Sequence, residues 1–415
     1  MAVSNSKLQQ TYSERDWTDF AHTGPDTLVG RYVRLFWHPI RRVEDLEPGR
    51  AKPIRIMSED LTLYRGEGGT PHLLAFRCAH RGTQLSTGWV EQDNLRCFYH
   101  GWMYDGSGQC VEQPAEPEPF CSKIRITSHP VVEYAGLIFA YLGGDPAPPP
   151  PHYQQFDQEG FFETETSVIP CNYFNCLEND AVHNAFAHSR GVPMPIPTIS
   201  AEETDWGLGE HARAPSGEVK TKQWGMPNKI HLLEPVDNAK TQFKHVIHWH
   251  VPIDDGHTLN FSQALVPLSG DVARAYQERA ADKATRKDVA GLVADILAGS
   301  LQLQRLYDER RGLSFNSLEH GICQMGQGTI ADRVTESLGA TDVSVVGYRQ
   351  IWTRELRALA EGRPLKEWRH TASIDPTEGD MRKRVARASE DFGSRLRWTA
   401  VVGAAEEAAP VVRDR

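Results

Sequence analysis

The stretch Cys78–His100, CAHRGTQLSTGWVEQDNLRCFYH, contains two couples of one cysteine and one histidine. The first couple has the spacing C-x-H, at Cys78 and His80, and the second has the spacing C-x-x-H, at Cys97 and His100. Thiolate and imidazole are the two ligand types that suit zinc and iron–sulfur centres. A zinc finger takes a pair of cysteines and then a pair of histidines, whereas here each short loop supplies one of each.

The pairing favours a [2Fe–2S] cluster of the Rieske type, in which Cys78 and Cys97 bind one iron and His80 and His100 bind the other. Each loop also has a glycine just after its histidine, in HRG and HGW, as expected if backbone N–H groups must approach the cluster sulfides. Two neutral imidazoles raise the reduction potential above that of an all-cysteine cluster. A structural Cys₂His₂ zinc site is the alternative.

The composition limits the classes of function. The chain has 415 residues, with 40% hydrophobic and 24% charged, which is ordinary for a soluble globular protein with more than one domain. The formal net charge of −10 argues against a nucleic-acid partner. The longest apolar runs are too short to cross a membrane, and no export signal opens the sequence. Seven cysteines, an odd number, argue against a disulfide framework, so we expect a cytoplasmic protein.

The pattern of the chain changes at a proline run, Asp145–Tyr153. Before it, residues 61–78 predict two strands joined by a glycine-rich turn, and residues 136–143 predict another strand. After it, residues 242–268 predict strands, whereas residues 272–311 and 341–362 predict helices, the last with Asp342 as its N-cap. We therefore expect an α+β protein. The expected parts are an all-β domain with an N-terminal extension over residues 1–150, a second domain over 151–400 and a flexible tail over 401–415.

The run CAHRGTQLSTGWVEQDNLRCFYHGWMYDGSGQCVEQPAEP, residues 78–117, resembles the Rieske domain of aromatic ring-hydroxylating oxygenase α-subunits, especially the phthalate-type branch. The resemblance implies a helix-grip catalytic domain, which is an antiparallel sheet with helices, and assembly as a homotrimer. It also implies a mononuclear non-haem Fe(II), and electrons from NAD(P)H delivered by a separate ferredoxin or flavin reductase. The remaining cysteines have no counterpart among the ligands, and we interpret them as ordinary residues: Cys110, Cys121, Cys171, Cys176 and Cys323.

A second metal site is suggested by DAVHNAFAH, in which Asp180 precedes His183 by three residues and His188 follows five later. Two histidines and one carboxylate form the facial triad of non-haem Fe(II) oxygenases. The spacing alone is weak evidence, because five residues of an ideal helix turn through about 500°, which leaves the imidazoles roughly 140° apart. The resemblance implies that His183 and His188 bind the iron. It implies that Asp180 bridges to a Rieske histidine of a neighbouring subunit.

The sequence does not decide which residue supplies the carboxylate ligand of the triad. The segment MGQGTIADRVTESLGATD, residues 325–342, is similar to one that follows an aspartate in phthalate-type relatives, and this alignment places His320 where the aspartate belongs. A carboxylate offsets the charge of Fe(II), so Glu319 is our candidate, with His320 and then Asp332 as alternatives.

Two further motifs resemble sites that we reject. Gly326–Ala331 fits G-x-G-x-x-A, but the preceding SLEHGICQM is a poor strand for a dinucleotide site. His248 and His250 fall on one face of a strand, and we interpret them as satisfied structural histidines rather than a zinc site. A basic run at residues 381–397 is interpreted as a solvated helix face.

The resemblance extends to the substrate class. Residues 23–40 and 53–82 look most like enzymes classed with 5,5′-dehydrodivanillate O-demethylases. This implies hydroxylation of an aryl methoxy group on an aromatic, lignin-derived acid by O₂, with release of formaldehyde and a phenol. Ring dihydroxylation of an aromatic acid is the alternative reaction. The alternative of another class is an electron-transfer Rieske protein that lacks the catalytic iron.

Overall fold

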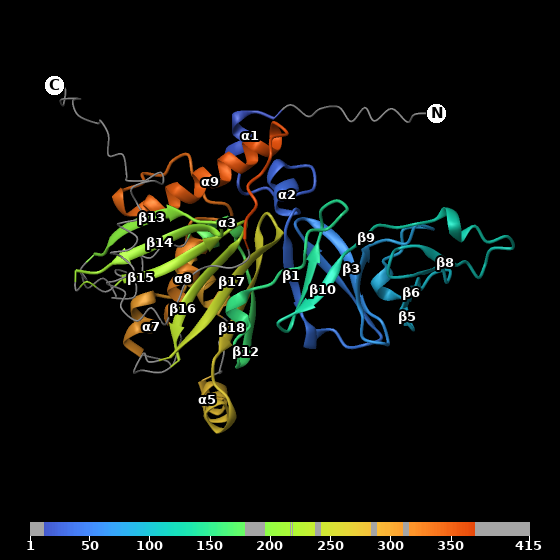
Figure 1. Ribbon diagram of the computed structural model, residues 1–415, viewed down its shortest axis with the longest axis horizontal. Coiled ribbons are helices and arrows are strands. Elements are labelled where there is room, and N and C mark those ends of the chain that lie inside the picture. The colour runs from blue at the N-terminus through green and yellow to red at the C-terminus, as the bar shows by residue number, and fades with distance from the viewer. Residues whose placement is uncertain are drawn as a thin grey trace.

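Figure 1 shows a computed structural model of the chain, which describes residues 12–178, 196–215, 217, 219–236, 242–283, 289–309 and 315–369. Small antiparallel sheets occupy one end of the molecule, and a large sheet with helices occupies the other.

Three small antiparallel sheets form between residues 37 and 141. The first, in the order β1-β11-β10, comprises β1 (Trp37–Arg42), β11 (Leu137–Tyr141) and β10 (Val131–Tyr134). The second comprises β2 (Arg50–Ile56), β3 (Glu59–Arg65), β4 (Pro71–Ala75) and β9 (Ser128–His129). The third comprises β5 (Trp89–Glu91), β6 (Asn94–Arg96), β7 (Met103–Tyr104) and β8 (Cys110–Glu112). The predicted pair of strands around a glycine-rich turn is confirmed as β3 and β4.

The second half is built on one antiparallel sheet with the order β12-β18-β17-β16-β15-β14-β13. Its strands are β12 (Phe161–Ile169), β13 (Thr198–Glu203), β14 (Gly207–Arg213), β15 (Val219–Gly225), β16 (Lys229–Pro235), β17 (Phe243–Asp254) and β18 (His257–Val266). The hairpin of β17 and β18 turns at Asp254, whose side chain accepts a hydrogen bond from the Gly256 backbone at 2.9 Å. The architecture is α+β, as predicted.

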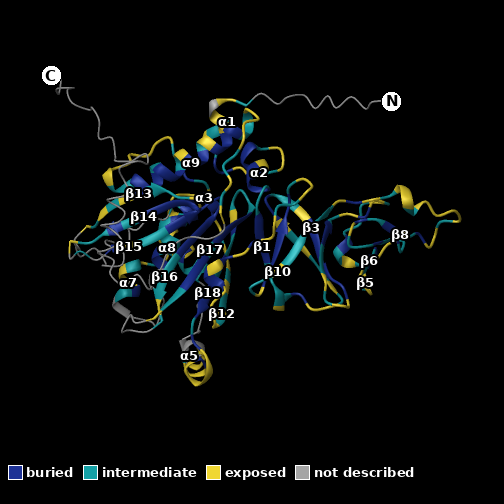
Figure 2. Ribbon diagram, viewed as in Figure 1, coloured by how far each residue is buried: buried dark blue, intermediate teal, exposed yellow. Residues whose placement is uncertain are grey.

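The helices are mostly short. They are α1 (Glu14–Thr18), α2 (Leu28–Val33), α3 (Tyr173–Leu177), α5 (Gly270–Lys283), α6 (Val289–Leu297), α7 (Leu303–Glu309), α8 (Phe315–Gly326) and α9 (Val343–Ala360). Single 3₁₀ turns lie at Val43–Asp45, Leu85–Thr87, Cys121–Lys123, Gln154–Phe156 and Ala340–Asp342. The apolar side of α9 packs on the sheet, where Tyr348 meets Trp224 edge to face at a centroid distance of 5.2 Å. Figure 2 shows that this sheet and α9 contain much of the buried surface.

The two halves share a core. Phe139 of β11 contacts Trp249 of β17 at 5.9 Å between ring centroids. The turn between β2 and β3 docks on the end of β17, because the Met57 and Ser58 N–H groups donate to Pro252 and Ile253 at 2.7 and 2.9 Å.

The proline run Asp145–Tyr153 connects these halves without regular structure. The Trp37 indole donates to the Pro148 carbonyl at 3.1 Å, and Tyr153 at the end of the run is buried in the core. The domain limits at residues 150 and 151 stay a prediction.

The helices predicted over residues 272–311 are observed as α5, α6 and α7, and a turn at Gly299 with a φ of +75° separates α6 from α7. The predicted N-cap of α9 needs correction. Asp342 does lie at the N-cap of α9, but its side chain makes no cap hydrogen bond there. It accepts instead from the Gly339 N–H at 2.6 Å, so it closes the preceding 3₁₀ turn.

Candidate functional site

The two cysteine–histidine loops have the same backbone geometry. The Cys78 N–H donates to Thr83 and the Gly82 N–H donates back to Cys78, both at 2.9 Å. In the second loop the Cys97 N–H donates to Trp102 at 2.8 Å, and the Gly101 N–H donates back to Cys97 at 3.1 Å. Each loop is therefore a tight turn that projects its histidine beyond its cysteine.

The glycines close these turns. Gly82 and Gly101 have φ angles of +73° and +75°, which residues with a side chain rarely adopt. A side chain at Gly101 would also meet the Pro114 ring at 2.8 Å. This turn geometry is a second reason for the glycines, and the close approach of backbone N–H groups to sulfides stays a prediction.

The cysteines lie inside the domain. Cys78 and Cys97 are buried with Leu85, Leu95 and Tyr104 in one apolar cluster. Burial raises the pKa of the Cys97 thiol, and the neighbouring Cys78 raises it further. Two adjacent buried thiolates need a cation to be stable, which is what an iron supplies.

A tyrosine contacts one of these sulfurs. The hydroxyl of Tyr104 lies 3.2 Å from Sγ of Cys78 and accepts a hydrogen bond from the Ala79 N–H at 3.1 Å. Burial raises the pKa of Tyr104 well above its usual value, so the phenol stays protonated. Because the hydroxyl oxygen already accepts from Ala79, its proton is available to the Cys78 sulfur.

The histidines lie outside the cysteines and side by side. The His80 and His100 ring centroids are 4.5 Å apart, and His80 stacks on Trp102 at 4.6 Å with an interplanar angle of 8°. Nδ1 of His80 is buried without a hydrogen-bond partner, as the ligating nitrogen of an apo site would be. Burial and the adjacent His80 lower the pKa of His100.

These four side chains fit a [2Fe–2S] cluster. Two thiols lie inside and two imidazoles outside, which matches the two ligands that each iron of a Rieske cluster takes. Among the residues that the structure describes, no three His, Cys, Asp or Glu side chains converge as ligands of a single ion. We keep Cys78, His80, Cys97 and His100 as proposed cluster ligands.

The proposed mononuclear iron site is described only in part. Asp180, His183 and His188 lie outside the described residues. Glu319 lies on α8 and is buried, and the Tyr307 hydroxyl donates to its Oε1 at 2.6 Å. A buried carboxylate is a ligand type that suits Fe(II), so the chemistry of Glu319 fits the metal.

The alternatives to Glu319 differ in their surroundings. His320 is the next residue of α8 and is half-buried. Asp332 is exposed, and its carboxylate accepts from the Val334 N–H at 3.2 Å, closing a local turn. The exposure of Asp332 makes it the least suitable ligand of the three.

The interpretation of His250 as a structural histidine rather than a zinc ligand stays a prediction, but its ring is not fully hydrogen-bonded. It is buried in β17, and its Nδ1 has no hydrogen-bond partner. Burial lowers the pKa of His250 to about 3, with further contributions from His248 and from His320 of α8. His320 is therefore near enough to His250 to influence its protonation. The alternation of side chains along a strand predicted that His248 and His250 lie on the same face. It did not predict which helix would lie near that face.

The rejected dinucleotide motif has no dinucleotide-binding geometry. Gly326 ends α8, the residues before it are helical rather than a strand, and Gly328 lies in the loop that follows. The other cysteines are free thiols. Within this set, the Sγ atoms of Cys171 and Cys176 lie 3.8 Å apart in the interior.

Comparisons with known proteins agree with this geometry. Residues 36–132 match the family model of the Rieske [2Fe–2S] domain. The paired loops and this match define a Rieske iron–sulfur protein. The chain is 30% identical to the 5,5′-dehydrodivanillate O-demethylase oxygenase subunit of Sphingobium sp. over 361 residues, 82% of this chain and 80% of that protein. It is 27% identical to the phthalate 4,5-dioxygenase oxygenase subunit of Pseudomonas putida over 377 residues, 81% of this chain and 84% of that protein.

Solved structures share the fold. The terminal oxygenase of carbazole 1,9a-dioxygenase from Novosphingobium sp. KA1 superposes with a TM-score of 0.59 at 18% identity, covering 83% of this chain and 97% of that one. An NdmA variant of Pseudomonas putida CBB5 with theobromine gives 0.60 at 20% identity, covering 80% and 92%.

The chain therefore belongs to the Rieske oxygenase α-subunits, as the sequence indicates, and is an enzyme of the Rieske oxygenase class. No helix among the described residues has the length and apolar character to span a membrane.

Proposed function

We propose that this chain is the oxygenase component of a multicomponent, cytoplasmic Rieske system that O-demethylates a methoxylated aromatic acid. The observation that carries the proposal is the 30% identity to the 5,5′-dehydrodivanillate O-demethylase subunit, which extends over 82% of the chain and so includes the catalytic half. In the reaction an aryl methyl ether, O₂, NAD(P)H and a proton give a phenol, formaldehyde, water and NAD(P)⁺. A bound Fe(II) would supply the O₂ chemistry.

The residues have distinct proposed roles. Cys78, His80, Cys97 and His100 hold the cluster that receives electrons from a ferredoxin or flavin reductase. His183 and His188 hold the iron, with Glu319 as the carboxylate ligand. Asp180 bridges to the cluster of a neighbouring subunit in a homotrimer.

Exposed aromatic residues beside the proposed cluster support a docking role for this end of the molecule. Trp89, Phe98 and Tyr99 are 51%, 60% and 53% exposed, and Tyr99 contacts His100 at a centroid distance of 3.8 Å. Large apolar side chains at the surface are typical of protein contacts. An electron donor that binds here would lie close to the imidazoles.

A second reaction, ring dihydroxylation of an aromatic acid, is supported by the 27% identity to a phthalate 4,5-dioxygenase subunit over 81% of the chain. The same iron could perform either reaction, and the carbon atom held nearest to it decides between them.

Product analysis separates the two. The purified chain, with a surrogate reductase and NADH, is given a panel of methoxylated and non-methoxylated aromatic acids. O-demethylation predicts formaldehyde and a phenol in equal amounts. A cis-dihydrodiol without formaldehyde would contradict O-demethylation and support dihydroxylation. A Cys97→Ser variant, which loses a proposed cluster ligand, is the negative control.

A further inference from the structure

Both cysteine–histidine loops begin with the same dipeptide, Arg–Cys, in the sequences RCAHRG and RCFYHG. Arg77 forms an antiparallel bridge with Gln84, and Arg96 on β6 pairs with Met103 on β7. Each arginine therefore stands at the base of its loop, and the opposite residue of the base follows seven positions later. The two loops have the same length, although the histidine lies one position later in the second.

The two arginine side chains make the same contact. Nη1 of Arg77 donates to the Gly82 carbonyl at 2.9 Å, and Nη1 of Arg96 donates to the Gly101 carbonyl at 2.8 Å. Both bonds end at the glycine whose positive φ closes the turn. Because the N–H of the same glycine donates to the cysteine carbonyl, each turn is held at both polar groups of its glycine. We call the Arg77–Gly82 and Arg96–Gly101 contacts the arginine clamps.

Two carboxylates reinforce the clamp of Arg96. Its Nε and Nη2 donate to the two oxygens of Glu91 on β5 at 2.6 and 2.8 Å, and Nη2 also donates to Glu112 on β8 at 2.8 Å. The Arg96 side chain is only 17% exposed, so these charge-assisted bonds are partly shielded from water. The guanidinium has a rigid, planar fork, so the carboxylates that hold it also direct Nη1 at the Gly101 carbonyl.

The clamp of Arg77 lies at the surface. The residue is exposed, and its guanidinium lies over the ring of the adjacent Phe76 at 5.4 Å from the centroid. A substitution of Arg77 therefore leaves no buried charge behind. It can change the position of the first loop without disturbing the interior of the domain.

We infer that Arg77 and Arg96 are positioning residues for the iron–sulfur cluster. His80 lies between the arginine and the glycine of the first clamp, and His100 lies between those of the second, so each clamp fixes the path of the chain that carries an imidazole. A loop without its clamp has more conformations, and binding the cluster then costs the entropy of ordering that loop. The inference rests on the proposed cluster ligands. Groups that orient metal ligands change metal affinity by about 10- to 100-fold when they are removed.

The test measures how fast an Fe(II) chelator removes the cluster from the reduced protein under anaerobic conditions, followed by visible absorbance. Arg77→Met removes the surface clamp. Arg96→Lys keeps a positive charge beside the two carboxylates but has no guanidinium fork. Arg125→Met is the matched control, because Arg125 is exposed and donates to the Ser107 carbonyl at 3.1 Å, in a loop of the same domain that carries no proposed ligand.

Two further measurements separate positioning from stability. The EPR spectrum of the reduced cluster reports the surroundings of its ligands, and urea unfolding reports the stability of the fold. We expect both clamp variants to release the cluster about 10-fold faster or more, with a broadened EPR signal because the imidazole is no longer held in one orientation. The free energy of unfolding of Arg77→Met should match that of the control, and the control should release its cluster within about twofold of the unmodified rate.

Each clamp variant tests its own loop. A release rate and an EPR spectrum equal to those of the unmodified chain would overturn the inference for that arginine. Faster release by Arg77→Met together with loss of its cooperative unfolding transition would also overturn it, because Arg77 would then hold the fold rather than a ligand loop. An unmodified chain that shows no Rieske-type signal would instead contradict the proposed cluster ligands themselves.

Discussion

The Tyr104 hydroxyl and the Cys78 sulfur lie 3.2 Å apart in the interior of the Rieske domain. A cluster-bound thiolate has no proton, so with the cluster in place the phenol would be the donor. A hydrogen bond to a cluster-ligating sulfur withdraws electron density from it and so stabilises the reduced, more negative state. Tyr104 is not a proposed ligand, but through this contact it influences the reduction potential at which the cluster accepts an electron.

Replacing Tyr104 by phenylalanine should lower the reduction potential of the cluster without removing it. If the bond favours the reduced state by about 1 kcal/mol, the shift is on the order of 40 mV for one electron. A redox titration followed by visible absorbance measures it. Tyr64→Phe is the matched control, because Tyr64 lies in the same apolar cluster but donates to the Asp93 carbonyl. Equal potentials in the Tyr104→Phe variant and the unmodified chain would contradict the role of this bond.

Glu319→Ala should lose the mononuclear iron and keep the cluster, whereas His320→Ala should keep both. The physical reason is that a buried carboxylate both binds Fe(II) and offsets its charge. Iron analysis per chain decides between the two residues. The opposite pattern would make His320 the ligand, and retention of iron in both variants would rule out both.

Lys229 should make the stability of the protein depend on pH. It begins β16 and is buried, with its ammonium 4.6 Å from the Trp206 ring centroid and 5.6 Å from that of Tyr153. Burial lowers its pKa from 10.5 to about 7. Between about pH 7 and the ordinary lysine value near 10.4, the unfolded chain therefore binds a proton that the folded chain does not. In this window the group makes the free energy of unfolding rise with pH, by at most about 1.4 kcal/mol per unit.

Lys229→Met should accordingly be more stable than the unmodified chain at pH 7, and the difference should shrink toward pH 10. Urea unfolding at several pH values measures this. Lys220→Met, which removes an exposed lysine of the adjacent strand, should show no such trend. A stability difference for Lys229→Met that does not vary with pH would contradict the low pKa of this lysine.

Phe98→Ser should raise the KM for the electron-donor protein and leave the cluster spectrum unchanged, because Phe98 is exposed beside the proposed ligands and packs on Trp89 at 5.3 Å. Val334→Ser, an exposed apolar residue of the catalytic half, is the control. An unchanged KM for the donor, measured by steady-state reduction, would place the docking site elsewhere.

Local sequence patterns were sufficient to predict the Rieske domain in the first half of the molecule. Four proposed ligands within 23 residues, with glycines beside the histidines, predict a Rieske cluster without any knowledge of tertiary contacts. Both glycines have positive φ and close the turns. The expected approach of backbone N–H groups to the cluster sulfides stays a prediction.

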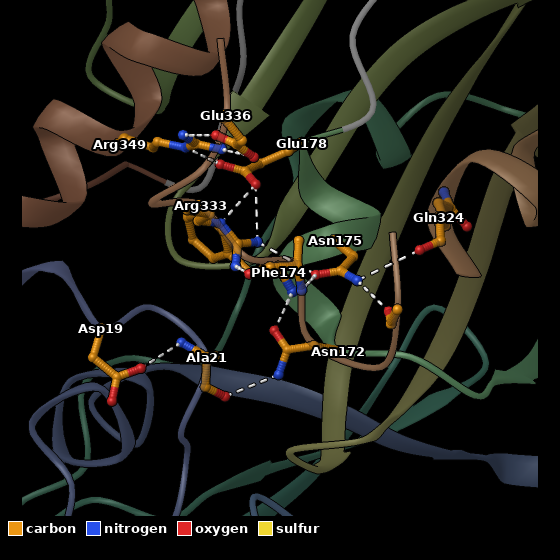
Figure 3. Close-up of polar contacts among 12 residues, drawn as sticks. Asp19, Ala21, Asn172, Phe174, Asn175, Glu178, Gln324, Arg333, Glu336 and Arg349 are labelled. Atoms are coloured by element: carbon orange, nitrogen blue, oxygen red, sulfur yellow. Dashed lines mark hydrogen bonds and ion pairs between the residues drawn. The ribbon is translucent and has the colours of Figure 1, made fainter. Parts of the chain in front are cut away.

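The catalytic half depends on contacts between distant segments, which a sequence does not encode locally. Glu319 and His320 are adjacent in sequence but point about 100° apart on a helix, so their roles depend on what α8 faces. His320 of that helix influences the pKa of His250 in β17, and Glu178 pairs with Arg333 and Arg349 from much later in the chain (Figure 3). None of these pairings has a signature in spacing or composition.

The central claim is that one polypeptide contains both a one-electron Rieske cluster and an oxygen-activating iron. Iron analysis combined with EPR of the dithionite-reduced protein tests it most directly. The account predicts three irons and two acid-labile sulfides per chain, together with a Rieske-type signal. Two irons with the same signal would leave an electron carrier without an oxygenase centre. A colourless protein that is EPR-silent and contains only zinc would contradict the account entirely.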